Sequence, residues 1–294
     1  MAGRLRPLLA LACFAVLLAG RPTGGFSLGL AVAIAGAGST ASGSPETARE
    51  LLDHARSLDH TSRAWKDRRQ KLALVIRDGR GGERRRELVM KTLRGEGGED
   101  KTLTVFVSPV EIRGTSFLQF AHRDRDAEQW LWLPALGRSR QISSRSKEES
   151  FVGTDFSYRD LELLTDVLEW NEEEARSSLL GSETLDGTEL VKIELVPVRK
   201  DVGYRRIRLA LSRPDLVIRR MEFFGEGEAP RKVLRLDGIE MVGVVPTARR
   251  LEMSQPAAST STVVDVSDVH YDQGFSPDSF TQHALESAGD EAGG

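Results

Sequence analysis

Cysteine is almost missing from this sequence, since its 294 residues contain only one, Cys13. Cys13 lies in a segment that we expect to be removed. The remaining chain would then have no disulfide, no thiolate nucleophile and no cysteine-ligated metal site. The five histidines are scattered, and no two of them are four residues apart, as two ligands on a metal-binding helix would be. These absences exclude most metal and nucleophilic chemistry, and we expect no cofactor.

The sequence also lacks a strong excess of either charge, with 41 Lys and Arg against 44 Asp and Glu. The first 37 residues hold three arginines and no acid, so the rest of the chain has 38 basic and 44 acidic residues, a net charge of −6. A net-acidic chain argues against non-specific binding to nucleic acid. With 39% hydrophobic and 29% charged residues, the composition is that of a folded soluble protein.

The amino terminus has the features of an export signal. Arg4 and Arg6 are followed by two apolar runs, Leu8–Gly20 and Phe26–Ala37, and the second run ends in Ala-x-Ala cleavage patterns. Each run is shorter than the roughly 20 residues of a membrane-spanning helix, and Arg21-Pro22 separates them. We therefore predict a cleaved signal peptide, with an uncleaved membrane anchor as the alternative.

One amphipathic helix is predicted directly after this signal. Ser44 can cap its first turn, Pro45 suits the first helical position, and Glu46 complements the helix dipole. Apolar residues then recur at steps of three and four as far as His60. This stripe consists of Ala48, Leu51, Leu52, Ala55 and Leu58.

From Ala64 onward the hydrophobic period changes to two, which is typical of strands. The predicted strands are 71–77, 84–93, 101–108, 116–123, 129–133, 139–143, 189–196, 204–212, 217–224, 231–236, 247–253 and 262–269. Helical patterns are scarce between them, so we predict an antiparallel meander that closes into a barrel or curls around something. In Val191–Leu195 the aliphatic residues point one way and the charged ones the other. One face of the sheet should therefore contact water and the other an apolar interior.

Residues 130–133 break this alternation, because Trp130 and Trp132 share one face and Leu131 and Leu133 share the other. A strand with one face in water should not be apolar on both. Two explanations stay open. Either a helix or loop covers the second face, or the segment forms a wall that contacts a ligand.

A helix start follows at Ser157, where Asp160 three residues later resembles a capping box with the shorter acid. The apolar face of this helix would hold Leu161, Leu164, Val167 and Leu168. Asp155, Tyr158 and Asp160 have the chemistry of acid–base groups. Helix capping and turn hydrogen bonds explain them more simply, and we favour that explanation.

The run WLWLPALGRSRQISSRSKEESFVGTDFSYRDLE, residues 130–162, resembles the signature of the outer-membrane lipoprotein-sorting-like family. These are exported proteins related in fold to the lipoprotein carrier LolA. With the flanking strands, the resemblance covers about residues 45 to 285. The positions that carry the motif are Trp132, Pro134, Gly137, Arg138, Phe151, Gly153, Asp155, Phe156, Tyr158, Asp160 and Leu161.

The resemblance implies a mainly β (α+β) fold, in which a curled antiparallel sheet of about 11 strands forms an incomplete barrel. Helices would cover its concave apolar face around a hydrophobic cavity. The implied domains are a signal peptide (1–37), a LolA-like lipid-carrier domain (38–286) and a disordered acidic tail (287–294). We find no counterpart of the arginine that holds the carrier's helical lid. The two motifs around Pro134 and Asp155 are not motifs of the true carrier.

The implied function is a non-catalytic, monomeric periplasmic carrier that binds the acyl chains of a lipid or lipoprotein and contacts membranes transiently. An inner-membrane exporter of hydrophobic compounds is a further implied partner. The candidate cavity wall consists of Leu72, Leu74, Ile76, Leu103, Val105, Val107, Phe117, Trp130, Trp132, Ile193, Leu195, Ile207, Leu209, Phe223 and Leu251. Each of these residues could equally be ordinary core.

Two other functions remain open. An enzyme is the first, although the sequence has no Gly-x-Ser-x-Gly, Gly-x-x-x-x-Gly-Lys or His-Glu-x-x-His motif. A glycosidase-like pair among the many carboxylates stays possible on sequence alone. The second is an accessory or adaptor protein that docks an exporter through its sheet and binds no lipid.

Overall fold

The structure is a computed structural model that describes residues 46–96, 99–122, 125–199 and 202–291. The described part contains one antiparallel sheet of 13 strands and three α-helices. The strands are β1 (Asp67–Arg77), β2 (Glu83–Leu93), β3 (Lys101–Ser108), β4 (Ser116–Phe120), β5 (Glu128–Leu133), β6 (Arg138–Gln141), β7 (Ala175–Leu185), β8 (Thr188–Pro197), β9 (Arg206–Ser212), β10 (Ile218–Phe224), β11 (Pro230–Val242), β12 (Val245–Gln255) and β13 (Thr260–Tyr271). The helices are α1 (Ala48–His60), α2 (Tyr158–Asp166) and α3 (Gln282–Glu291).

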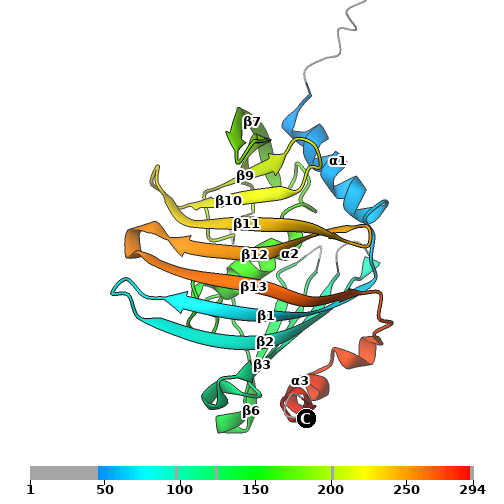
Figure 1. Ribbon diagram of the computed structural model, residues 1–294, viewed down its shortest axis with the longest axis vertical. Coiled ribbons are helices and arrows are strands. Elements are labelled where there is room, and N and C mark those ends of the chain that lie inside the picture. The colour runs from blue at the N-terminus through cyan, green and yellow to red at the C-terminus, as the bar shows by residue number, and fades with distance from the viewer. Residues whose placement is uncertain (1–45, 97–98, 123–124, 200–201, 292–294) are drawn as a thin grey trace, which may run out of the picture. The chain divides into compact units, whose positions relative to one another are not determined.

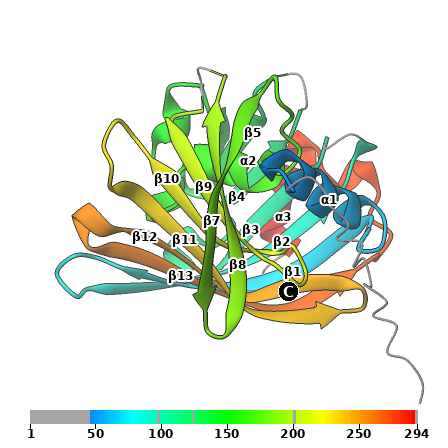
Figure 2. The ribbon, with the colours of Figure 1, turned by 90° about the horizontal axis from the view of Figure 1, so that it is seen from above.

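Two meanders build the sheet, and the pairing of β1 with β13 joins them. The spatial order is β6-β5-β4-β3-β2-β1-β13-β12-β11-β10-β9-β8-β7, so β6 and β7 are the edges among the described residues. Figure 1 shows β11, β12, β13, β1 and β2 side by side, and Figure 2 shows the sheet bending around α2. The sheet is therefore curled but open, as predicted.

The two faces of the sheet carry different cores. On the concave face, α1 and α2 share one large apolar cluster with strands from both meanders, including Leu74, Phe106 and Phe223. On the outer face, a smaller cluster joins α3 to β3, β4 and β5 through Leu285, Leu118 and Trp130. The concave face thus carries the larger core, and the outer face carries a smaller one under α3.

The predicted fold class is confirmed, but the sheet has 13 strands rather than about 11. Strand β7 was not predicted, because it is an edge strand whose residues are mostly exposed and polar and show little apolar alternation. The cap predicted at Ser44 is not the observed one. Thr47 caps α1 and forms a capping box with Glu50.

The C-terminal segment also differs from the prediction. Helix α3 continues to Glu291, through residues expected to form a disordered tail from Ser287. Leu285 and Ala288 of this helix are buried against β3, β4 and β5, which gives even a small-residue segment a packing surface. The predicted signal peptide, residues 1–37, lies outside the described residues. Among the residues that are described, no helix is long and apolar enough to span a membrane.

Candidate functional site

A cavity of about 460 Å³ lies on the concave face of the sheet. Its floor comes from β1 and β2, where Leu72 pairs with Leu88 and Gln70 pairs with Met90 across the two strands. Alternation along β1 turns Leu72 and Leu74 inward and leaves Lys71 and Ala73 on the outside.

Helix α2 forms the opposite wall of the cavity. Leu161 and Leu164, together with Leu168 just beyond the helix, line the cavity while remaining only partly buried. Strands β11 to β13 add Leu236, Leu251 and Val264. The lining is therefore mainly apolar on both sides, with a few neutral polar residues such as Thr104, Gln119 and Thr165, and the side chains of α2 and the sheet do not fill the space between them.

One end of the cavity is polar. Arg63, Arg68 and Arg94 line it, as do Asp59, Asp100 and Glu169. Trp65 and Tyr271 also lie there, with their ring centroids 5.4 Å apart. Burial raises the pKa of Asp100, and the Arg94 guanidinium opposes that shift. The cavity thus has an apolar floor and one charged end, lined by these three arginines and three acids, which we call the mouth.

The family motif lies beside this cavity, and Asp155 attaches it to the sheet. The buried carboxylate of Asp155 accepts hydrogen bonds from the hydroxyls of Thr260 and Thr262 on β13 and from the amide of Gln255 on β12. The backbone N–H of Asp155 donates to the Thr262 hydroxyl at 2.9 Å. Both oxygens of the acid are engaged in holding the loop, as the structural explanation predicts.

Asp160 has the same kind of role at the start of α2. It is fully buried and accepts from Lys232 Nζ and Tyr204 Oη, each at 2.6 Å. It also accepts from the backbone N–H of Ser157 at 2.7 Å, which completes the predicted capping box. Burial and the neighbouring Asp160 charge raise the pKa of Tyr204, so its hydroxyl stays protonated and donates.

The aromatic motif residues pack together under this loop. Phe151 contacts Phe117 and Tyr158 at ring-centroid distances of 5.1 and 5.6 Å. Gly153 has a φ of +76°, which glycine adopts without strain. Its carbonyl and that of Val152 accept from Arg84 and Arg86 of β2. Phe156 is buried in the same cluster, and Leu161 lines the cavity.

The other end of the motif lies on the outer side of the fold. Trp132 packs against the outer cluster, and Pro134 begins a short 3₁₀ turn that Gly137 ends at a φ of +57°. Arg138 is exposed at the start of β6. This half of the motif forms a turn and does not contact the cavity.

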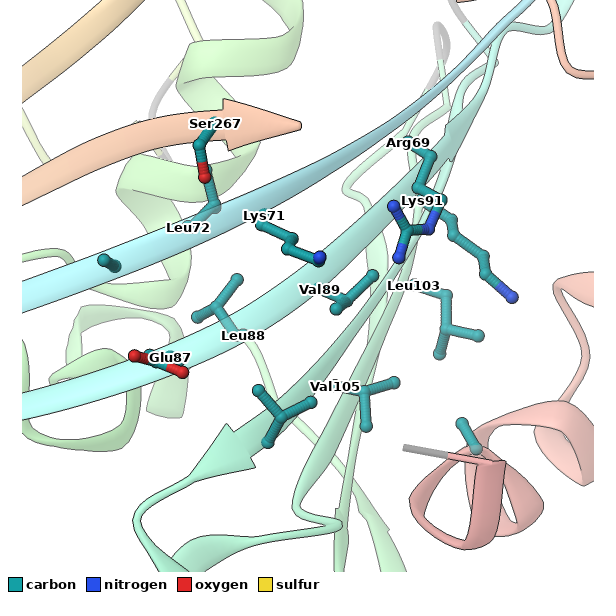
Figure 3. Close-up of a pocket in the computed structure, with 13 residues that line it drawn as sticks. Arg69, Lys71, Leu72, Glu87, Leu88, Val89, Lys91, Leu103, Val105 and Ser267 are labelled. Atoms are coloured by element: carbon teal, nitrogen blue, oxygen red, sulfur yellow. The ribbon is translucent and has the colours of Figure 1, made fainter. Parts of the chain in front are cut away.

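A second hollow, of about 620 Å³, lies on the outer face between α3 and β1, β2 and β3. Figure 3 shows Val89, Leu103 and Val105 on this face with basic side chains beside them. Arg69 and Lys71 both pair with Asp268, at 2.8 and 3.0 Å. This outer groove is therefore charged along one side, unlike the aliphatic floor of the cavity.

The structure brings only part of the predicted cavity wall to the cavity. Leu72, Leu74, Phe117 and Leu251 line it. Five further predicted residues belong to the large apolar cluster of the concave face but do not line the cavity. They are fully packed, with at most 2% of each residue exposed: Ile193, Leu195, Ile207, Leu209 and Phe223. Ile76 is buried but contributes to neither hollow.

The remaining predicted wall residues lie on the outer face, which corrects the prediction. Leu103, Val105 and Val107 line the outer groove, and Trp130 and Trp132 pack in the cluster under α3. A period of two shows which residues share a face, but it does not show which face turns inward. Of the two explanations left open for residues 130–133, coverage by a helix is the one observed.

Several residues of the cavity were not predicted from the sequence. Met90 and Leu88 were placed in a strand but not on its inner face, and the apolar stripe of α2 was recognised without being assigned to the wall. Arg68 gave no signal, because an arginine in a strand usually lies in water. Among the described residues, no three His, Cys, Asp or Glu side chains are placed to share a metal ion.

Comparisons with known proteins agree with this architecture. A protein-family model that is described as an uncharacterized protein matches residues 98–287. An outer membrane lipoprotein-sorting protein domain from Vibrio parahaemolyticus is 27% identical in sequence, with a TM-score of 0.74 over 81% of this chain and 98% of that one. A DUF1329 family protein from Desulfovibrio piger has the same identity, TM-score and coverage.

A LolA superfamily protein from Nitrosomonas europaea is 16% identical, with a TM-score of 0.61 over 81% of this chain and 99% of that one, and shares the fold. No curated protein matches the sequence. The family model covers more than half of the chain, and the motif at residues 130–162 lies within it. The chain belongs to the outer-membrane lipoprotein-sorting-like family and has a LolA-like fold.

Proposed function

We propose that this protein is a non-catalytic periplasmic carrier that holds the acyl chain of a lipid or lipoprotein in the concave cavity and hands it between membranes. The observation that carries the proposal is the aliphatic space left between α2 and the sheet. The sorting role named for the Vibrio relative supports it, as do the export-signal features of residues 1–37.

The size of the cavity fits one chain. Its volume of about 460 Å³ is within the range of about 300–1,000 Å³ that small-molecule pockets have. Each methylene removed from water contributes about 0.8 kcal/mol, or roughly 10 kcal/mol for a whole chain. Such a ligand needs no covalent bond or metal to stay bound. Its release requires a membrane or an exporter that offers a comparable apolar environment.

The motif acids support a role without catalysis. Asp155 and Asp160 have the right chemistry for acid–base work, but their oxygens accept hydrogen bonds from the sheet, from Lys232 and from Tyr204. A general base needs an oxygen that reaches the substrate. The oxygens of these two carboxylates instead accept hydrogen bonds from other residues of the protein.

The test is native mass spectrometry of the exported protein after mild purification from membranes. Leu164→Trp would fill the cavity from α2, and Leu180→Trp makes the same change at an exposed position on β7. We expect co-purified lipid on the wild type and on Leu180→Trp, and at least tenfold less on Leu164→Trp. An empty wild-type protein, with no added fatty acid retained, would instead favour the adaptor function.

A further inference from the structure

The three arginines at the cavity mouth differ in how they are paired. Arg63 donates to the backbone carbonyl of Asp215 at 2.6 Å and lies 3.9 Å from the Asp59 carboxylate. Arg94 donates to the backbone carbonyl of Asp59 at 3.1 Å and lies 3.9 Å from Asp100. Both are held in place by the protein.

Arg68 has no such partner. Within the described residues its guanidinium forms no hydrogen bond or ion pair, and its Nε is buried with no acceptor. Its guanidinium carbon lies 5.1 Å from the centroid of the Trp65 ring, which Arg94 also contacts, and its charge favours the ionised form of Asp100 without forming an ion pair with it. Leaving a buried N–H donor unpaired is unfavourable. The Nε groups of Arg49 and Arg159 also lack an acceptor, but both of those guanidiniums form ion pairs, whereas that of Arg68 forms none among the described residues.

The acids at the mouth do not supply the missing partner. Asp59 and Asp100 lie beside Arg63 and Arg94, and Glu169 contacts the ring of His60 at 2.8 Å. Of the three arginines at this end, Arg68 is therefore the one whose guanidinium has no hydrogen bond or ion pair among the described residues.

The position of Arg68 along β1 connects this charge to the cavity. Arg68, Gln70, Leu72 and Leu74 follow one another at every second residue and all line the cavity. One strand thus presents a cation, a neutral amide and then two aliphatic side chains. This gradient matches a molecule with an anionic head and one hydrocarbon tail.

We propose that Arg68, stacked on Trp65, binds the anionic head of the cargo, a carboxylate or phosphate on a single acyl chain. The inference rests on the proposed carrier function and deepens it by naming the cargo's chemistry. A guanidinium suits either oxyanion, because its N–H groups can pair with two oxygens at once.

The experiment is calorimetric titration of the exported chain below the micelle concentration of each probe. The probes are palmitate, hexadecyl phosphate, uncharged 1-monopalmitoylglycerol, and inorganic phosphate alone. Arg68→Gln is the test variant. Arg69→Gln is the matched control, since Arg69 is the next residue on β1 but lies on the outer face and pairs with Asp268.

We expect Arg68→Gln to weaken palmitate and hexadecyl phosphate about tenfold to a hundredfold and to change the uncharged lipid less than twofold. Whichever of the two anionic lipids binds the wild type more weakly carries the head group that the site accommodates less well. Arg69→Gln should bind every probe as the wild type does. Inorganic phosphate alone should not bind measurably, because the tail supplies most of the affinity.

Two results would overturn the inference but leave the carrier function standing: equal loss of all three lipids in Arg68→Gln, or no loss of any. Tight binding of inorganic phosphate would also overturn it, since the site would then recognise a free anion. If the wild type binds none of the lipids, the carrier proposal fails together with the inference.

Discussion

The polar groups around the cavity fall into two regions with opposite character. In the motif segment, residues 147–162, the buried charges are paired. Lys147 contacts Glu162 at 3.0 Å and Asp160 contacts Lys232 at 2.6 Å. At the mouth, Arg68 is a cation without a hydrogen bond or ion pair in the part of the chain that the structure describes. These buried charges of the motif segment thus have ionic partners within the protein, whereas the charge of Arg68 has none among the described residues.

The largest effect should follow from Asp160→Ala. Removing this carboxylate leaves Lys232 as a buried, unpaired charge and also breaks the capping box of α2. We expect a loss of about 3–5 kcal/mol in the free energy of unfolding, measured by denaturant titration. Glu50→Ala removes the corresponding capping-box acid of α1, which is exposed, and should lose much less. Equal losses would mean that the Lys232 pair contributes nothing.

Asp155→Ala tests the second attachment of the motif. The variant leaves Thr260, Thr262 and Gln255 without their acceptor, so we expect a loss of about 2–3 kcal/mol in the same titration. Asp265→Ala on β13 removes an exposed acid that pairs with Arg250 and should change the stability little. An unchanged stability in Asp155→Ala would remove the structural explanation of this acid.

The carboxyl-terminal end of α2 gives a pH prediction. Burial, reinforced by the Glu162 charge, raises the pKa of Asp166 from 3.8 to about 7. The folded state therefore favours the protonated acid, and this contribution to stability is present below about pH 4 and is lost as the pH rises through 7. The side chain is 20% exposed with Arg199 at 4.0 Å, so we expect about 2 kcal/mol rather than the full shift.

Asp166→Asn should remove that pH dependence. Denaturant titrations at pH 5 and pH 8 would show the wild type losing more stability than the variant over this interval, by about 2 kcal/mol. Glu173→Gln, an exposed neighbour after the helix, is the control and should follow the wild type. Parallel pH profiles for Asp166→Asn and the wild type would contradict the raised pKa.

The smallest effect on stability should come from Arg68→Gln. The change removes a cation–π contact worth about 0.5–1 kcal/mol and also removes a buried unpaired N–H group, so the two effects oppose each other. We expect the free energy of unfolding to change by less than about 1 kcal/mol, measured as above. A loss as large as that of Asp160→Ala would show that Arg68 stabilises the fold and would end the contrast between the two regions.

Much of this fold follows from short-range patterns in the sequence. Alternation predicted most of the strands, the spacing of Ser157 and Asp160 predicted the start of α2, and the motif indicated the family. Edge strand β7 escaped because its exposed, polar residues do not alternate.

The site was harder to predict, because it depends on which face turns inward and on which groups meet. Leu72 and Leu103 look alike in sequence, yet one lines the cavity and the other lies under α3. Likewise, nothing near Arg68 in the sequence shows that it lacks a partner. That is decided by strands and loops distant along the chain.

The central claim is that the acyl chain lies on the concave face, and photo-crosslinking tests it most directly. A palmitate analogue with a diazirine in its tail would be bound to the exported chain, irradiated and located by peptide mass spectrometry. We predict crosslinks in α2, Tyr158–Asp166, which contributes Leu161 and Leu164 to the cavity. Crosslinks in α3, which lies only over the outer groove, with none in α2, would contradict the account.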